Sequence, residues 1–305
     1  ELSMADRAWL LDASIYIFRA WFSMPDRWHT DDGLPLNAVY GYAGFLCDLL
    51  TRVHPSPYLA AAFDESLGSC FRNELYPEYK ASRVLPDEDL AFQLDSCRQL
   101  TELCGIRCYG GPRFEADDYL ASLARLAGEQ GLPMTVITRD KDLGQLLVNK
   151  EDRWWDFAAG QTLDVVGFEQ RFGVHPAQFA DYLGLVGDSV DDIPGVPGVG
   201  PKTGAALVSQ LGSLDVIGAD LQATAQLPLR GASRLPDKLA AHWPQALLSR
   251  QLAKLESAVP DVDRLPEFSL RSSQVESVLG FLETLGLQGP LSRRWQKLSE
   301  TGLTA

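Results

Sequence analysis

Acidic residues recur where short apolar segments of this chain end, and this repetition constrains the fold more than any other feature. Short apolar runs that alternate with helical patterns are typical of buried parallel strands joined by helices. The runs and the acids that follow them are 8–11 with Asp12, 58–63 with Asp64, and 134–138 with Asp140 and Asp142. Because the carboxyl ends of parallel strands meet at one edge, the sequence predicts an α/β sheet with a site at that edge.

A further acidic segment begins a predicted helix. Glu115, Asp117 and Asp118 precede the periodic apolar pattern of residues 119–126. Glu115 and Asp118 are three residues apart and share one helix face, with Asp117 displaced around the axis. Acids in a first turn also complement the helix dipole. The triplet alone therefore fits either a helix cap or a set of metal ligands.

The segment 187–203 combines acids with a glycine-rich turn. Asp188 and Asp191 come first, and Gly198 and Gly200 precede Lys202 and Thr203 at the start of an apolar helical pattern. Small residues let a backbone approach a ligand closely, and free N–H groups at a helix start attract anions. This predicts a hairpin between helices that binds a nucleic-acid phosphate. The alternative is an ordinary Gly/Pro-rich loop with proline at the first helical position.

Residues 69–83 interleave cations with aromatic residues. The cations are Arg72, Lys80 and Arg83, and Tyr79 is one of the aromatics. Such a pattern suits the backbone and exposed bases of a nucleic acid. A surface excursion with amphipathic packing is the alternative.

The net charge of −14, from 27 basic and 41 acidic residues, opposes non-specific nucleic-acid binding. Clustering of the acids in one cation-filled site would resolve this conflict. Carboxylates without histidine or cysteine favour Mg²⁺ or Mn²⁺ over zinc, and two such ions can hydrolyse a phosphodiester. The candidate ligands are Asp12, Asp64, Glu115, Asp117, Asp118, Asp140, Asp142, Asp188 and Asp191.

The remaining composition excludes several protein classes. The 5 cysteines contain no pair of CxxC units, so we expect free thiols, and the 4 histidines lie outside the acidic segments. No apolar run is long enough to cross a bilayer and no signal peptide is evident, so a cytoplasmic protein without membrane association is expected. Residues 1–3 precede Met4 and are left out of the fold prediction.

The order of the motifs resembles the 5′-nuclease domain of bacterial DNA polymerase I and the related phage and cellular flap endonucleases. The resemblance extends over about residues 8–287. It depends on LLDAS at 10–14, AAFDE at 61–65, FRNELYPEYKASR at 71–83, FEADD at 114–118, TRDKDLGQLL at 138–147 and GDSVDDIPGVPGVGPKTGAALV at 187–208. It implies an α/β, PIN-like, mostly parallel sheet flanked by helices, with a helical arch and a helical C-terminal region containing a helix-hairpin-helix motif.

The resemblance also implies roles for individual residues. Lys80 and Arg72 would stabilise charge on the scissile phosphate, while Tyr79 and Arg83 would lie on the arch and contact DNA. The first metal would be held by Asp12, Asp64, Glu115, Asp117, Asp118 and Asp140, and the second by Asp142, Asp188 and Asp191. The hairpin would bind duplex DNA through Gly198, Gly200, Lys202 and Thr203. A K⁺ ion would be held by the carbonyls of Leu185, Val186, Pro194, Val196 and Val199.

These implications give a division of the chain and a function. Residues 4–175 would form the nuclease domain with the arch at about 69–86, 176–290 the DNA-binding region, and 291–305 a tail. We expect a monomeric, stand-alone nuclease or an excised domain that cleaves DNA at 5′ flaps, forks and 5′ ends in replication or repair. A non-catalytic DNA-junction binder and a related ribonuclease are the alternatives. Asp192 stands where many relatives carry Asn, with an effect that the sequence does not define.

Overall fold

The computed structural model describes residues 7–301, so residues 4–6 of the predicted nuclease domain and 302–305 of the predicted tail lie outside the described residues. The strands form one sheet in the order β3-β2-β1-β4-β5-β6. Their bounds are β1 (Ala8–Asp12), β2 (Tyr58–Ala62), β3 (Arg107–Tyr109), β4 (Met134–Ile137), β5 (Arg153–Asp156) and β6 (Gln161–Leu163). Only β6 pairs antiparallel, against β5, so the mostly parallel sheet is confirmed.

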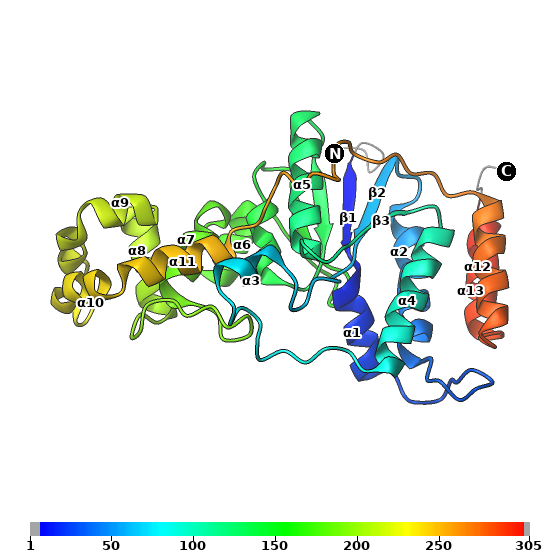
Figure 1. Ribbon diagram of the computed structural model, residues 1–305. Coiled ribbons are helices and arrows are strands. Elements are labelled where there is room, and N and C mark those ends of the chain that lie inside the picture. Colours follow the sequence, from blue (N-terminus) through cyan, green and yellow to red (C-terminus); the bar gives the residue numbers. More distant parts are fainter. Residues whose placement is uncertain (1–6, 302–305) are drawn as a thin grey trace.

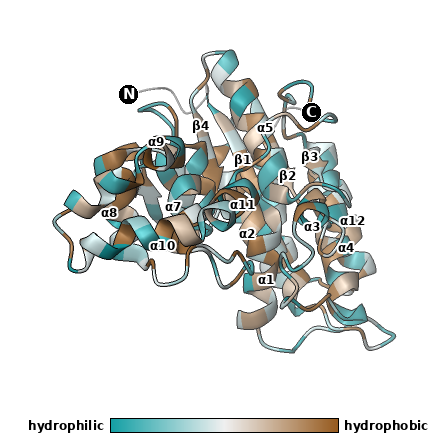
Figure 2. Cartoon of the chain, turned by 60° about the vertical axis from the view of Figure 1, so that its left-hand side comes forward, coloured by the Kyte–Doolittle hydropathy of each residue, from teal (hydrophilic) through white to brown (hydrophobic). Residues whose placement is uncertain are grey.

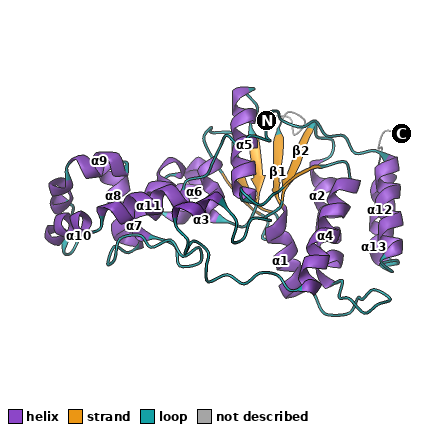
Figure 3. Ribbon diagram, in the orientation of Figure 1, coloured by secondary structure: helices purple, strands orange, loops and turns teal. Residues whose placement is uncertain are grey.

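Alternation along β1 explains which residues face which helices. Trp9 and Leu11 belong to an apolar cluster with α1 (Ala13–Ser23), α2 (Asn37–Val53) and α4 (Glu88–Leu103), whereas Leu10 packs in a cluster with α5 (Ala116–Glu129). Figure 3 shows the strands between these two sets of helices. Side chains two residues apart share a sheet face. Asp12 therefore lies on the same face as Leu10, toward α5.

The C-terminal half is mostly helical and extends away from the sheet (Figure 1). Its elements are α6 (Val165–Phe172), α7 (Phe179–Val186), α8 (Pro201–Leu211), α9 (Leu214–Ala219), α10 (Leu235–Ala241) and α11 (Trp243–Ala253). Short 3₁₀ helices are η2 (Lys141–Leu146), η3 (Pro176–Gln178), η4 (Leu221–Gln226) and η5 (Ala232–Arg234). Hydrophobic and hydrophilic stretches alternate along these helices in Figure 2, as expected for elements with one face on a core. Leu207 and Leu252 share one apolar cluster with Leu10 of the sheet.

The last two helices return to the α/β half. Helices α12 (Ser272–Thr284) and α13 (Pro290–Ser299) lie beside α2 and α4 in Figure 1, and Val278 and Trp295 are buried in the same cluster as Leu46 and Leu100. Leu291, Trp295 and Leu298 recur on one helix face. This differs from the prediction of a tail from residue 291, because that apolar face folds the segment to Ser299 into the packed structure.

The loop between α7 and α8 is a tight hairpin. At two of its positions only glycine fits the backbone. The backbone nitrogens and oxygens of Asp188 and Ile193 form a reciprocal pair at 2.9 and 2.8 Å. Gly187 and Gly195 both have positive φ, and a Cβ on Gly195 would lie 2.3 Å from the Gly187 nitrogen. This closure leaves Gly198 exposed beyond the hairpin.

The predicted arch region is helical over only a short part of its length. Helix α3 (Phe71–Leu75) is followed by turns and then by extended chain that leads to α4. Figure 1 shows this segment crossing between the two halves of the molecule. Among the described residues, no helix combines the length and the apolar character needed to span a membrane.

Candidate active site

Acidic side chains from separate elements meet at the carboxyl edge of the sheet. Asp12 ends β1, Asp64 follows β2 and Asp140 follows β4. Thr138 joins two of these segments, because its hydroxyl donates to Asp12 Oδ2 at 2.7 Å and accepts from the Asp140 N–H at 2.9 Å. Asp140 also caps η2 by accepting from the Asp142 N–H at 2.9 Å. The edge predicted from the sequence is therefore where these acids lie.

Burial and the negative charges of neighbouring acids raise the pKa of several of these side chains. Burial raises the pKa of Asp12 to about 7, and the negative charges of Asp140 and Asp64 add to this. Burial and then Asp140 raise the pKa of Asp142 to about 7. Burial, Asp140 and Asp12 hold the pKa of Asp117 well above its usual range. Crowded, poorly solvated carboxylates of this kind gain from a nearby cation.

Lysine and arginine side chains from the arch region supply part of that positive charge. Lys80 Nζ contacts Glu115 Oε1 and lies 4.0 Å from Asp191 Oδ1. Arg83 Nη2 also pairs with Asp191 Oδ1. Burial opposes ionisation of Glu115, but the charges of Lys80 and Arg72 hold its pKa below the usual value.

The Lys141 ammonium bridges an acid that follows β4 and an acid of the hairpin loop. Its ammonium lies 3.0 Å from Asp142 Oδ1 and 3.1 Å from Asp188 Oδ2. Burial opposes ionisation of Asp188, yet Lys141 lowers its pKa below the ordinary value. The hairpin acids thus lie against the acids that follow β4. Sequence reasoning missed Lys141 and Thr138, although both belong to the TRDKD motif that carried the family resemblance.

The acids fit a hard divalent cation by ligand type, although they do not converge on one point. Every candidate ligand offers carboxylate oxygens, which Mg²⁺ and Mn²⁺ prefer. Within residues 7–301, no three His, Cys, Asp or Glu side chains are close enough to hold a metal ion as they stand. Lys80 and Lys141 lie among them instead. A cation bound to Asp142 and Asp188 would compete with the Lys141 ammonium for the same carboxylate oxygens.

Arg72 has a different environment from the one predicted. Its side chain is 1% exposed. Its nitrogens donate to both oxygens of Asp118 at 2.7 Å, to Glu115 at 2.9 Å, and to the carbonyls of Leu252 at 2.8 Å and Lys254 at 2.9 Å. No nitrogen of this guanidinium is left for a phosphate. Arg72 joins α3 to the start of α5 and to the end of α11.

Two other predicted residues are also used within the protein. The Asp118 side chain is fully buried, and besides Arg72 it accepts from the N–H groups of Glu115 at 3.0 Å and Glu256 at 2.8 Å. The Tyr79 hydroxyl donates to Glu115 Oε2 at 2.8 Å from a buried ring. These contacts differ from the predicted roles of Asp118 as a metal ligand and Tyr79 as a DNA contact.

The predicted phosphate-binding turn lies on the surface. Gly198, Gly200 and Lys202 are exposed. Lys238, which no motif indicated, donates to the Gly198 carbonyl at 3.1 Å and so brings a second ammonium to the turn.

Two of the five carbonyls predicted to hold K⁺ accept hydrogen bonds within the hairpin. The Leu185 carbonyl accepts from Val196 N–H at 2.7 Å, and the Val196 carbonyl accepts from Val199 N–H at 3.0 Å. A potassium ion there stays a prediction.

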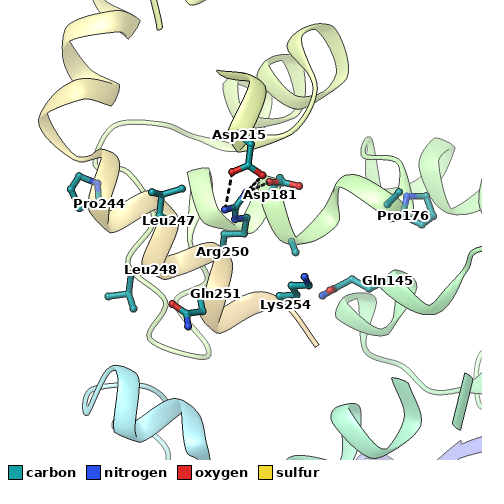
Figure 4. Close-up of a pocket in the computed structure, with 12 residues that line it drawn as sticks. Gln145, Pro176, Asp181, Asp215, Pro244, Leu247, Leu248, Arg250, Gln251 and Lys254 are labelled. Atoms are coloured by element: carbon teal, nitrogen blue, oxygen red, sulfur yellow. Dashed lines mark hydrogen bonds and ion pairs between the residues drawn. The ribbon is translucent and has the colours of Figure 1, made fainter. Parts of the chain in front are cut away.

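A pocket of about 810 Å³ lies apart from the acids, between α7, η2 and α11 (Figure 4). Arg250 pairs there with Asp181 at 3.3 Å and with Asp215 at 2.9 Å, and so joins α11 to α7 and α9. None of the predicted metal ligands lines this pocket. We therefore assign no catalytic or binding role to this pocket.

Comparison with protein families defines the class of protein. Residues 7–173 match the 5′-3′ exonuclease, N-terminal resolvase-like domain, and residues 174–276 match the 5′-3′ exonuclease, C-terminal SAM fold. The chain therefore belongs to the 5′-3′ exonuclease family.

Known relatives and solved structures agree with this assignment. The chain is 38% identical to DNA polymerase I of Pseudomonas aeruginosa over 84% of its own length and 28% of the polymerase. It is 35% identical to DNA polymerase I of Rhizobium leguminosarum over 93% of its length and 28% of that polymerase. It thus spans under a third of these relatives.

Two solved structures share the fold. T5 5′-exonuclease with bound divalent metal ions (zinc) has a TM-score of 0.62 at 19% identity, covering 96% of this chain and 99% of the other. The catalytic core of Rad2 in complex with DNA substrate has a TM-score of 0.63 at 17% identity, covering 98% and 92%.

Proposed function

We propose that this protein is a divalent-metal-dependent 5′-nuclease that hydrolyses DNA phosphodiesters at 5′ flaps, forks and 5′ ends in replication or repair. The observation that carries this proposal is the acidic set at the sheet edge, with Lys80 and Arg83 directly against it. Membership in the 5′-3′ exonuclease family supports the reaction class. The T5 structure with metal ions and the Rad2 structure with DNA substrate support the cofactor and the substrate.

Two or more Mg²⁺ or Mn²⁺ ions would be held by acids from both halves. A bound divalent cation would polarise the scissile phosphate and activate water for its hydrolysis. We assign the first metal to Asp12, Asp64, Asp117 and Asp140, and the second to Asp142, Asp188 and Asp191. Glu115 is left out because Arg72 and Tyr79 hold one of its oxygens, and Asp118 is left out because its oxygens hold Arg72.

The chain's own residues position these groups and supply positive charge. Thr138 fixes the Asp12 carboxylate through its hydroxyl. Lys80 would stabilise negative charge on the phosphate, as a cation beside a developing oxyanion does. For this it must leave Glu115, which a metal ion at the acids would favour by taking over the neutralising role. Arg83 is 39% exposed and so is available to the DNA backbone.

The hairpin would hold the duplex at a fixed distance from the acids. Gly198, Gly200, Lys202 and Thr203 are its contacts, with the α8 N-terminus directed at a phosphate. A K⁺ ion on the hairpin carbonyls would strengthen this grip. We expect the protein to act as a monomer in the cytoplasm.

The proposal is tested with a DNA duplex that carries a 5′ flap. We expect cleavage in Mg²⁺ or Mn²⁺, no cleavage in EDTA, and loss of cleavage in Asp140→Ala. A matched control is Asp164→Ala. It removes the α6 N-cap carboxylate, which accepts from the Gly167 N–H at 2.7 Å. Binding without metal-dependent cleavage would instead indicate a junction-binding protein. Preferential cleavage of an RNA flap would indicate a ribonuclease.

A further inference from the structure

The arch region is attached to the hairpin loop by contacts that involve Asp192. The Asp192 Oδ2 atom accepts from the Ser82 N–H at 2.9 Å and from the Ser82 hydroxyl at 2.7 Å. The Lys80 N–H donates to the Asp191 carbonyl at 2.9 Å, and Arg83 Nε lies 3.4 Å from the Val190 carbonyl. Lys80, Ser82 and Arg83 are therefore held against residues 190–192.

Both partners of this contact have an unusual backbone. Lys80 has φ of 53° and Asp192 has φ of 56°, and these are the two non-glycine residues with positive φ among residues 7–301. A side chain in this region is disfavoured, and such conformations persist where surrounding contacts hold them. Asp and Asn adopt the left-handed conformation more readily than other non-glycine residues. Lysine has no such preference, so the hydrogen bond from the Lys80 N–H to the Asp191 carbonyl and the bonds from Ser82 to Asp192 hold this turn in place.

The turn determines where two cations point. With residues 80–83 in this position, Lys80 reaches Glu115 and Arg83 reaches Asp191. Asp192 is not one of the candidate metal ligands, and its side chain bonds to Ser82. The carboxylate accepts hydrogen bonds from Ser82, which lies between the two cations in sequence, and the charge of Arg83 adds to its stabilisation.

We propose that Asp192 is a positioning residue, which anchors the Lys80–Arg83 turn to the hairpin loop so that both cations face the acidic site. The proposal rests on the proposed nuclease function and deepens it, since it couples the segment that binds the duplex to the segment that neutralises the scissile phosphate. The carboxylate acts through its acceptor oxygen. An amide oxygen at the same position keeps the acceptor and the anchoring contact, although it lacks the negative charge.

A first test needs neither DNA nor metal and measures hydrogen exchange of the amides of Lys80 and Ser82. In Asp192→Ala we expect the Ser82 amide to exchange about tenfold faster or more, as loss of a charge-assisted hydrogen bond implies. Asp192→Asn keeps an acceptor and should retain protection, as should the control Asp164→Ala. Ser82→Ala removes only the hydroxyl bond and should retain protection of its own N–H. Unchanged exchange in Asp192→Ala would overturn the anchoring.

A second test separates rate from affinity with a 5′-flap duplex in Mg²⁺. We expect Asp192→Ala to lower the single-turnover cleavage rate by ~10- to 100-fold, the scale expected of a misplaced catalytic group, with flap affinity unchanged. Asp192→Asn should restore the rate. Equal loss of rate and affinity, or an Asn variant as slow as the Ala variant, would overturn positioning through the hydrogen bond. If the wild-type protein does not cut, the proposed function fails, whereas the exchange test still decides the anchoring.

Discussion

Replacement of Arg72 should destabilise the fold, although the family resemblance implied that this residue is one of the catalytic cations. Arg72→Met keeps the length of the apolar stem and removes the guanidinium. It leaves the Asp118 carboxylate with no exposed surface and without its charged partner. Breaking a buried ion pair by removing one member costs about 3–5 kcal/mol. The carbonyls of Leu252 and Lys254 lose their donors in the same change, so the upper part of that range applies.

The assay is urea unfolding of the metal-free protein, followed by fluorescence and circular dichroism. We expect a lower midpoint in Arg72→Met and in Asp118→Asn. The double variant should lose less than the sum of the two single changes, because each removes the same interaction. A free energy of unfolding within about 1 kcal/mol of wild type in Arg72→Met would refute the reasoning, since exposed sites behave that way. Slower cleavage with unchanged stability would indicate instead that Arg72 acts in catalysis.

Three further outcomes follow from the geometry. Lys80→Ala should slow cleavage more than it weakens DNA binding, whereas Lys202→Ala should mainly weaken binding of the duplex; equal affinity loss with unchanged turnover in both would contradict these roles. Asp12 and Asp142 have a pKa of about 7 in the folded protein, far above the unfolded value, so the free energy of unfolding falls as pH rises toward 7 and levels off above it. In EDTA the thermal midpoint should therefore rise as pH falls from 8 to 6, and Mg²⁺ should stabilise more at pH 8; a midpoint that falls on this acidification would argue against it. Gly195→Ala should destabilise by ~1–3 kcal/mol through its backbone clash, and more than Gly231→Ala, which shares a positive φ but has open space around it; equal loss by thermal unfolding would count against the close approach.

The sheet could be predicted because its signals are local. Short apolar runs that end in an acid indicated β1, β2 and β4, since runs of this length are typical of buried strands. The strand β6 was missed, because its residues Gln161, Thr162 and Leu163 form a short, largely polar edge. The return of α12 and α13 to the sheet half was also missed. Their apolar faces can be read from sequence, but the surface that they cover cannot.

The sequence indicated the sheet edge at which the acids lie, but not the contacts that each charged residue makes there. Sequence shows which residues carry charge, and it does not show which of them face solvent. Arg72 looks like a cation for DNA until its partners at Leu252 and Lys254 are known, and these lie far along the chain. Asp118 looks like a ligand until its hydrogen bonds are counted. Lys238 contacts the hairpin turn, and no sequence motif indicated this contact.

If the acidic site holds the catalytic metal ions, the protein should cut DNA strands that end in a free 5′ flap. The most direct measurement compares two DNA duplexes of one sequence, one with a 5′ flap and one with a 3′ flap, each labelled at the flap and incubated with Mg²⁺. We expect release of the 5′ flap by cuts near the junction, a 3′ flap left intact, and no product with EDTA. Cleavage of both flaps at equal rates, or of neither, would contradict it.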